Sequence, residues 1–216
     1  MAADQCAVTF NLGRMPMRTS TNVRKIFWDE GKGVACCFSG DQCAERVADD
    51  LVEAVRNGQF DRADTKTELE RIANARSQKE LARLGRNWNS QAARAVFVVF
   101  CDKQEGWMLQ VSDDSFAQLV NPYGTVHIGD IGNPAVFFAE RYHPAHLPVL
   151  RPVRELIFLA AHCVLEASSF SPRGIFGLDV LIFQHGRFHW LNDAEVVDLK
   201  TRSKALADAI CTTIFR

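Results

Sequence analysis

The chain has 216 residues, of which 47% are hydrophobic and 24% charged, and its formal net charge is −1. This composition is typical of a folded globular protein and argues against disorder of the whole chain. The balanced charge argues against a dedicated nucleic-acid binder, which normally carries a basic surplus. No apolar run approaches the roughly 20 residues of a membrane-spanning helix, and the first residues lack the pattern of a secretory signal. We therefore expect one cytoplasmic domain over residues 1–216, with neither nucleic acid nor membrane as partner.

The seven cysteines give no sign of a disulfide framework or a metal site. Their number is odd, and no two of them have C-x-x-C spacing. His143 and His146 are flanked by prolines, which favours a loop over a pair of metal ligands. A thiol or metal enzyme built on Cys36, Cys37 and Cys43 has little support from their spacing. We expect no metal and no cofactor.

The first part of the chain predicts short strands followed by a helix. Strands are predicted over 7–10 and 23–28, and a strand buried on both faces over 33–39, where the run GVACCFS is continuously apolar. Apolar residues three and four apart from 43 to 55 then predict an amphipathic helix. The next segment, 61–86, is rich in charged residues and keeps only a narrow apolar stripe. It reads as a solvated helix or helix pair, or alternatively as a partner-docking surface.

The rest of the chain groups its strands and its helices separately. The apolar runs and turn residues predict these elements in order: strands over 95–101, 106–112, 116–120 and 126–131, helices over 133–142 and 149–167, a hairpin of 178–183 with 187–191, and a last helix capped by Asn192 or Asp193. Grouped strands argue against alternating βαβ units. The apolar strands need cover on both faces. We therefore expect an α+β protein, with two antiparallel sheets packed face to face in a four-layer αββα sandwich.

Four stretches in this order resemble the proteasome-type N-terminal-nucleophile hydrolases, which include proteasome β subunits and their bacterial relatives. The stretches are MAAD at 1–4, RKIF at 24–27, CCFSGDQCAERVADDLVEAV at 36–55, and the run from HIGDIGNPAVFFAERY at 127–142 to GLDVLIFQHGRFHWL at 177–191. The resemblance covers most of the chain. It implies the αββα fold and a threonine-type endopeptidase ancestry.

In this family an N-terminal threonine supplies the nucleophilic hydroxyl and the α-amine that acts as base. A lysine lowers the barrier electrostatically, an aspartate holds that lysine, and a backbone N–H near a strand glycine stabilises the oxyanion. The resemblance places the lysine at Lys25 and the acid at Asp4, across a gap longer than is usual for the family. It places Cys37 where the strand glycine normally lies.

The remaining family positions depart further from the pattern. The serine of the glycine-rich turn falls on Ile131, or on Asp130 with a shifted gap. The late aspartate–serine pair falls in SSFSPRG, where Ser169 and Ser171 are retained but no aspartate is. The resemblance therefore implies that Cys37, Asp130, Ile131, Ser169 and Ser171 line the site.

The family's first strand, which carries the threonine, is missing from the 216 residues, because only three residues precede Asp4. Removal of Met1 would expose Ala2, which has no nucleophile. Three explanations stay open: the start lies at an internal methionine of a longer chain, the protein is a non-catalytic relative, or cleavage exposes another residue such as Cys6 or Thr9 and discards Asp4.

Two functions follow from the resemblance. The first is a proteasome β-like protein of threonine-type endopeptidase ancestry, inactive in the 216-residue form and acting on peptides or proteins if an extension supplies the nucleophile. The second is a non-catalytic assembly or binding subunit on the same fold. In both, the resemblance implies self-association into a ring or another homo-oligomer.

Overall fold

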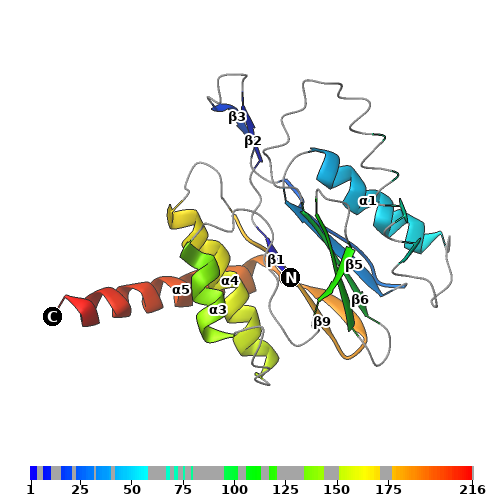
Figure 1. Ribbon diagram of the computed structural model, residues 1–216. Coiled ribbons are helices and arrows are strands. Elements are labelled where there is room, and N and C mark those ends of the chain that lie inside the picture. The colour runs from blue at the N-terminus through cyan, green and yellow to red at the C-terminus, as the bar shows by residue number, and fades with distance from the viewer. Residues whose placement is uncertain are drawn as a thin grey trace. The chain divides into compact units, whose positions relative to one another are not determined.

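The computed structural model describes residues 1–3, 7–10, 16–20, 23–31, 33–39, 42–57, 67–68, 71–72, 75, 79, 95–101, 106–112, 117–120, 134–143, 151–170 and 177–215. They belong to two compact units (Figure 1). The helix unit comprises Met1–Arg24, Gly132–Ile182 and His189–Arg216. The sheet unit comprises Lys25–Ile131 and Phe183–Phe188. Among the described residues, no helix is both long and apolar enough to cross a membrane.

The sheet unit is built on a five-stranded antiparallel sheet of order β4-β5-β6-β7-β8. Its strands are Ile26–Asp29 (β4), Val34–Ser39 (β5), Ala95–Cys101 (β6), Gly106–Ser112 (β7) and Ala117–Val120 (β8). The predicted meander of three consecutive strands is confirmed as β6, β7 and β8. The turn between β4 and β5 ends at Gly33, whose φ of 64° is a conformation that glycine adopts without a steric penalty.

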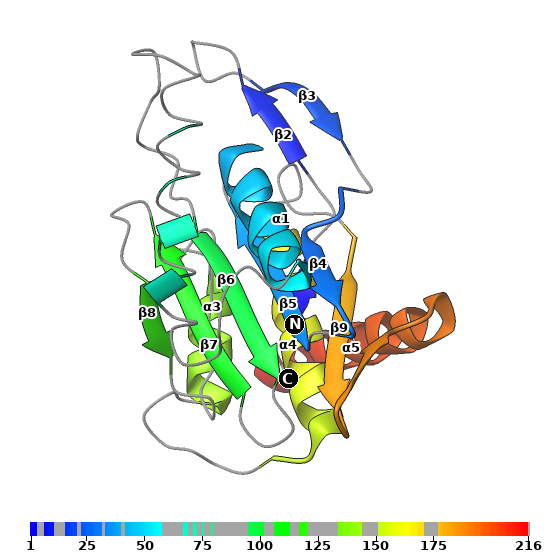
Figure 2. The ribbon, with the colours of Figure 1, turned by 90° about the vertical axis from the view of Figure 1, so that its right-hand side faces the viewer.

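Helix α1 (Gln42–Arg56) covers one face of this sheet and contacts β4, β5 and β6 (Figure 2). Its apolar residues recur every three or four positions, so they form one stripe that faces the sheet. Ala48, Leu51 and Val52 on this stripe are buried. At the end of the helix the Arg56 guanidinium binds the Asp29 carboxylate at 2.8 Å, which ties α1 to β4.

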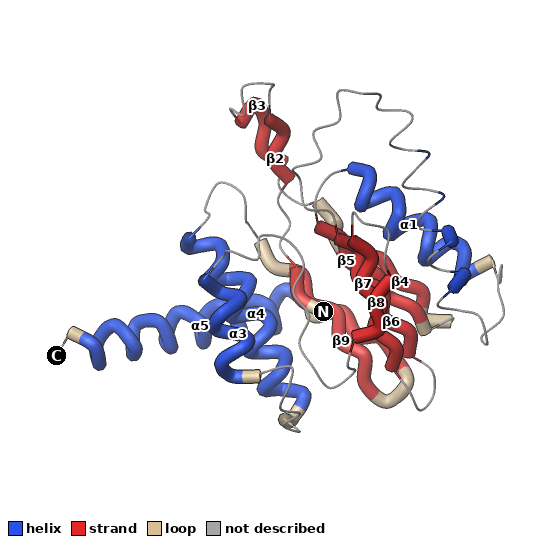
Figure 3. The backbone as a smooth tube through the Cα atoms, viewed as in Figure 1, coloured by secondary structure: helices blue, strands red, loops and turns tan. Residues whose placement is uncertain are grey.

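The helix unit contains α3 (Pro134–Tyr142), α4 (Val153–Phe170) and α5 (Asp193–Ile214), shown in blue in Figure 3. Helix α4 packs against α3, α5 and strand β1 (Ala2–Ala3). β1 joins a sheet of order β1-β9-β10, with β9 at Asp179–Gln184 and β10 at Arg187–Trp190. One buried core cluster of this unit contains Ala161, Leu178, Val180, Leu191 and Leu199.

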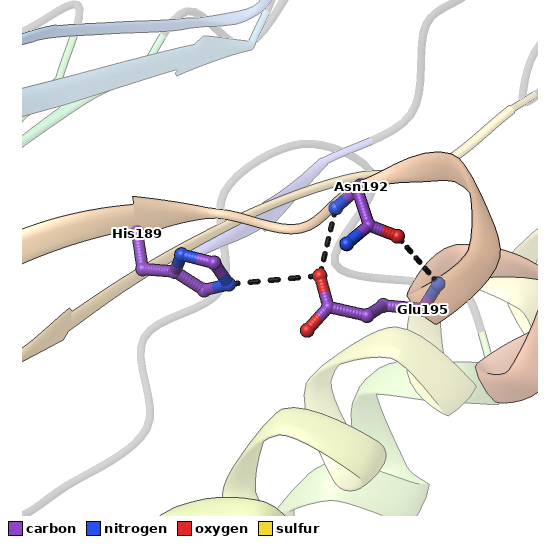
Figure 4. Close-up of polar contacts among 3 residues, drawn as sticks. All are labelled: His189, Asn192 and Glu195. Carbon is purple, nitrogen blue, oxygen red and sulfur yellow. Dashed lines mark hydrogen bonds and ion pairs between the residues drawn. The ribbon is translucent and has the colours of Figure 1, made fainter.

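Helix α5 begins with a capping box, which decides between the two predicted cap residues in favour of Asn192. The Asn192 side chain accepts a hydrogen bond from the Glu195 N–H at 3.1 Å, and the Glu195 carboxylate accepts one from the Asn192 N–H at 2.8 Å (Figure 4). His189 of β10 lies 3.6 Å from the same carboxylate. The cap therefore satisfies two backbone donors at the point where the hairpin turns into the helix.

Several predicted boundaries need correction. The predicted strand at 7–10 is confirmed as β2 (Ala7–Phe10), but its partner β3 (Pro16–Ser20) was not predicted. The helix predicted over 149–167 begins only at Val153, because Pro152 disfavours helical backbone at the residue before it. The predicted strand at 126–131 lies outside the described residues. Within 61–86, the six described residues are helical, in agreement with the predicted helices.

The fully buried Leu51 offers a test of the α1–sheet core. Leu51→Ala should lower the free energy of unfolding by about 2–5 kcal/mol, because the neighbouring strands cannot close the cavity. Urea denaturation followed by circular dichroism measures this loss. Glu53→Ala, on the exposed face of the same helix, is the matched control and should change stability by less than about 0.5 kcal/mol. Equal losses in both variants would contradict the assigned helix face.

Candidate functional site

Two of the predicted site residues, Lys25 and Cys37, lie on adjacent strands of the sheet unit. Lys25 immediately precedes β4, and its carbonyl accepts a hydrogen bond from the Phe38 N–H at 3.2 Å. Ile26 pairs directly with Cys37 in the β4–β5 ladder. The antiparallel register therefore places the predicted catalytic lysine beside the cysteine that replaces the family's strand glycine.

The two neighbouring thiols on β5 are poor nucleophiles. Burial raises the pKa of the Cys37 thiol to about 12. Cys36 is fully buried, and burial likewise raises its pKa well above the ordinary value, with smaller contributions from Cys37 and Asp49. Because the thiolate is the reactive form of cysteine, both groups are inert near neutral pH. Across the described part of the chain, no group of three or more His, Cys, Asp or Glu residues could hold a metal ion.

This chemistry predicts selective thiol labelling. At pH 8, iodoacetamide should modify Cys211, which is exposed on α5, and leave Cys36 and Cys37 unmodified in the folded protein. The reason is that the raised pKa keeps the β5 thiols protonated. Peptide mapping by mass spectrometry measures the extent at each site, and labelling in urea provides the control. Modification of Cys37 in the folded protein as fast as that of Cys211 would refute the assignment.

Ser169, which the resemblance places after the helix pair, lies within a helix instead. Ser169 lies in the last turn of α4, and its hydroxyl donates a hydrogen bond to the Glu166 carbonyl at 2.7 Å. Asp4, Asp130, Ile131 and Ser171 lie outside the described residues. Of the predicted site, the structure therefore brings together Lys25 and Cys37, and it assigns the Ser169 hydroxyl to a local backbone contact.

The helix unit holds a buried polar pair that the sequence analysis did not identify. His162 of α4 and Ser203 of α5 are 2% and 4% exposed, and the His162 Nδ1 lies 2.7 Å from the Ser203 Oγ. The imidazole stacks on Phe158 with a centroid distance of 5.7 Å and meets the edge of Phe138 at 5.3 Å. The Arg202 guanidinium lies 4.7 Å from the Phe158 ring centroid. The sequence does hold a signal for this pair, because His162 and Ser203 each interrupt the apolar stripe of a helix.

The surroundings of His162 oppose its protonation. Burial lowers the pKa of the imidazole from its ordinary value of 6.5, and Glu166 counteracts this in part. The unfolded chain then binds a proton near pH 6.5, whereas the folded chain binds it only at lower pH. The stability contributed by the neutral imidazole is therefore complete above pH 6.5 and declines as the pH falls below that value.

The lowered pKa of His162 gives a prediction for how thermal stability depends on pH. The Tm of the wild type should fall more steeply from about pH 7 to pH 5 than that of His162→Asn, which cannot take up the proton. Differential scanning calorimetry at several pH values measures both slopes. His185→Asn is the control, because His185 is exposed in a turn with a φ of 53° that asparagine tolerates. Parallel slopes for wild type and His162→Asn would exclude this role for His162.

Comparison with known proteins identifies the fold. No family model matches the sequence, and no curated protein matches it significantly. Among solved structures, the Anbu complex from Pseudomonas aeruginosa, described as a helical assembly, is similar with a TM-score of 0.71 and 13% identity, over 97% of this chain and 90% of that one. Anbu (ancestral beta-subunit) from Yersinia bercovieri is similar with a TM-score of 0.71 and 12% identity, over 99% and 91% of the two chains.

A third similar structure is a Gly-1 mutant of Anbu from Hyphomicrobium sp. strain MC1, with a TM-score of 0.64 and 13% identity, over 99% of this chain and 90% of that one. At these identities the comparisons show the fold alone. The chain has the α+β fold of these ancestral beta-subunits, which is proteasome-like. The resemblance seen in the sequence is thus confirmed at the level of the fold.

Proposed function

We propose that this chain is a self-associating, proteasome β-like subunit of threonine-type endopeptidase ancestry that acts in the cytoplasm. The observation that carries the proposal is the shared fold, which extends over 97–99% of this chain and 90–91% of the Anbu chains. The P. aeruginosa relative is described as a helical assembly, which supports self-association. The four-layer αββα sandwich is part of the same proposal and has the same support.

Catalysis by this family's chemistry requires a nucleophile whose own α-amine is available as the base. In the structure the Met1 amine donates a hydrogen bond to the Leu181 carbonyl at 2.7 Å, and the Leu181 N–H donates to the Met1 carbonyl at 2.9 Å. The terminal amine is thus engaged in pairing with β9. Methionine carries neither a hydroxyl nor a thiol. We therefore propose that a chain whose first residue is Met1 lacks peptidase activity, with Lys25 and Asp4 marking its ancestry.

A non-catalytic assembly or binding subunit is the second candidate. It is favoured by the state of the described thiols near Lys25, because protonated Cys36 and Cys37 cannot themselves act as nucleophiles. It is also favoured by Cys37 itself, whose side chain occupies the position of the family's strand glycine.

Both candidates predict assembly, and both predict that the 216-residue form does not hydrolyse peptides. Light scattering coupled to size exclusion should give a mass several times the 24.2 kDa of the chain. In a separate assay, the wild type should hydrolyse fluorogenic peptides no faster than Lys25→Ala does. A monomer at every concentration tested would contradict self-association. Hydrolysis that Lys25→Ala abolishes would show that the 216-residue form is an active enzyme.

A further inference from the structure

The large hydrophobic side chains that the described residues expose all belong to the helices of the helix unit or to the residue that caps α5. They are Phe137 and Tyr142 of α3, Phe170 of α4, Val197, Ile210 and Ile214 of α5, and Phe215, which caps α5. Single exposed apolar side chains are common on folded proteins, whereas several gathered at one place mark an interaction site. The end of α5 has the highest exposure, with Ile214 and Phe215 at 67% and 83%.

The exposed end of α5 continues the face that packs against α4. Leu199 and Ser203 are buried on this face, and steps of three and four residues lead through Leu206 to Ile210 and Ile214. Residues at this spacing share one side of a helix. From residue 208 to 215 every side chain is exposed, and this part of α5 runs on past α4 (Figure 3). Within the described part of the chain, the apolar stripe is therefore longer than the surface that covers it.

The amino-acid composition at the end of α5 also indicates that a partner covers it. Ile210, Cys211, Thr212, Thr213 and Ile214 follow one another, and all five have low intrinsic helix propensity. Such a run is stable as a helix mainly when one of its faces is packed. Residues 205–215 carry no basic side chain and one acidic one, Asp208. A membrane-surface helix needs a basic polar face, so this composition favours a protein partner.

A second copy of the chain offers the matching surface. Each copy carries both the projecting end of α5 and an apolar side chain on α3, Phe137, that is 65% exposed. The charges of α5 are also self-complementary. Its start is acidic, with Asp193, Glu195 and Asp198, and its middle is basic, with Lys200, Arg202 and Lys204. Within one helix Arg202 lies 3.6 Å from Asp198, and the Glu195 carboxylate takes part in the cap. An antiparallel approach of two α5 helices therefore brings opposite charges together, whereas a parallel approach brings like charges together.

We propose that the end of α5 is a self-association surface, on which Ile210, Ile214 and Phe215 dock against the helix layer of a second copy. The inference rests on the proposed self-assembly and identifies its contact. Each α5 inserts against the partner while the partner's α5 inserts in return, so the contact is closed by a two-fold axis. The anchors are apolar, and the opposite charges along α5 set the direction of approach.

The test is the concentration-dependent mass of the full chain and two single variants. Ile214→Asp places a charge on the docking face and should weaken self-association by roughly tenfold or more. Thr212→Asp places the same charge in the same turn on the opposite face and should leave it within about twofold of wild type. Sedimentation equilibrium measures the dissociation constants. Circular dichroism checks the folds, which should be unaffected because both positions are exposed.

The outcomes separate this inference from the proposed function. Weakening by Ile214→Asp alone supports the docking surface. Assembly of Ile214→Asp and of a second variant, Phe215→Asp, with wild-type affinity would overturn the docking surface while leaving self-assembly intact. Equal weakening by Thr212→Asp and Ile214→Asp would also overturn it, because the effect would not depend on the face. A monomeric wild type would reject both the surface and the assembly.

Discussion

The packing of α4 against its neighbours is the interaction on which the helix unit depends. α4 contacts α3, α5 and β1, and its most buried polar group, His162, is satisfied by Ser203 of α5 and enclosed by aromatic rings. An unsatisfied polar group in this place would cost more than an apolar one, so the pair fixes how α5 lies on α4. Because α5 is fixed at this point, the rest of the helix continues past α4 with its apolar stripe still exposed.

A different constraint organises the sheet unit. Antiparallel pairing between β4 and β5 sets Ile26 opposite Cys37 and brings the Lys25 carbonyl to the Phe38 N–H. A shift of one residue in this register would turn Ile26 and Val34 out of the core, so the buried side chains enforce it. The positions of Lys25 and Cys37 thus follow from core packing. Core packing keeps Lys25 and Cys37 close together whether or not the chain catalyses a reaction. Their arrangement is therefore compatible with both candidate functions.

Much of the fold was predictable because its signals are local and periodic. The continuous apolar run of β5, the three-and-four spacing of α1 and the meander of β6 to β8 can each be read from a short window. β3 was missed because Pro16 and the polar residues after it carry no strand pattern, and only pairing with β2 defines it. In the candidate site, Lys25 and Cys37 were found through the resemblance. The contact of His162 with Ser203 was not, because 41 residues separate the two in the chain.

The sequence by itself determined the class of fold and the order of most of the elements. These are properties of residue type and local spacing, which need no long-range contact to be read. Only the tertiary structure decided that Cys36 is buried, that both β5 thiols are protonated and that Ser169 binds its own helix. It also decided that the apolar stripe of α5 extends beyond the surface that α4 covers. Burial, pKa and exposure depend on which distant segments pack together, and that is settled when the chain folds.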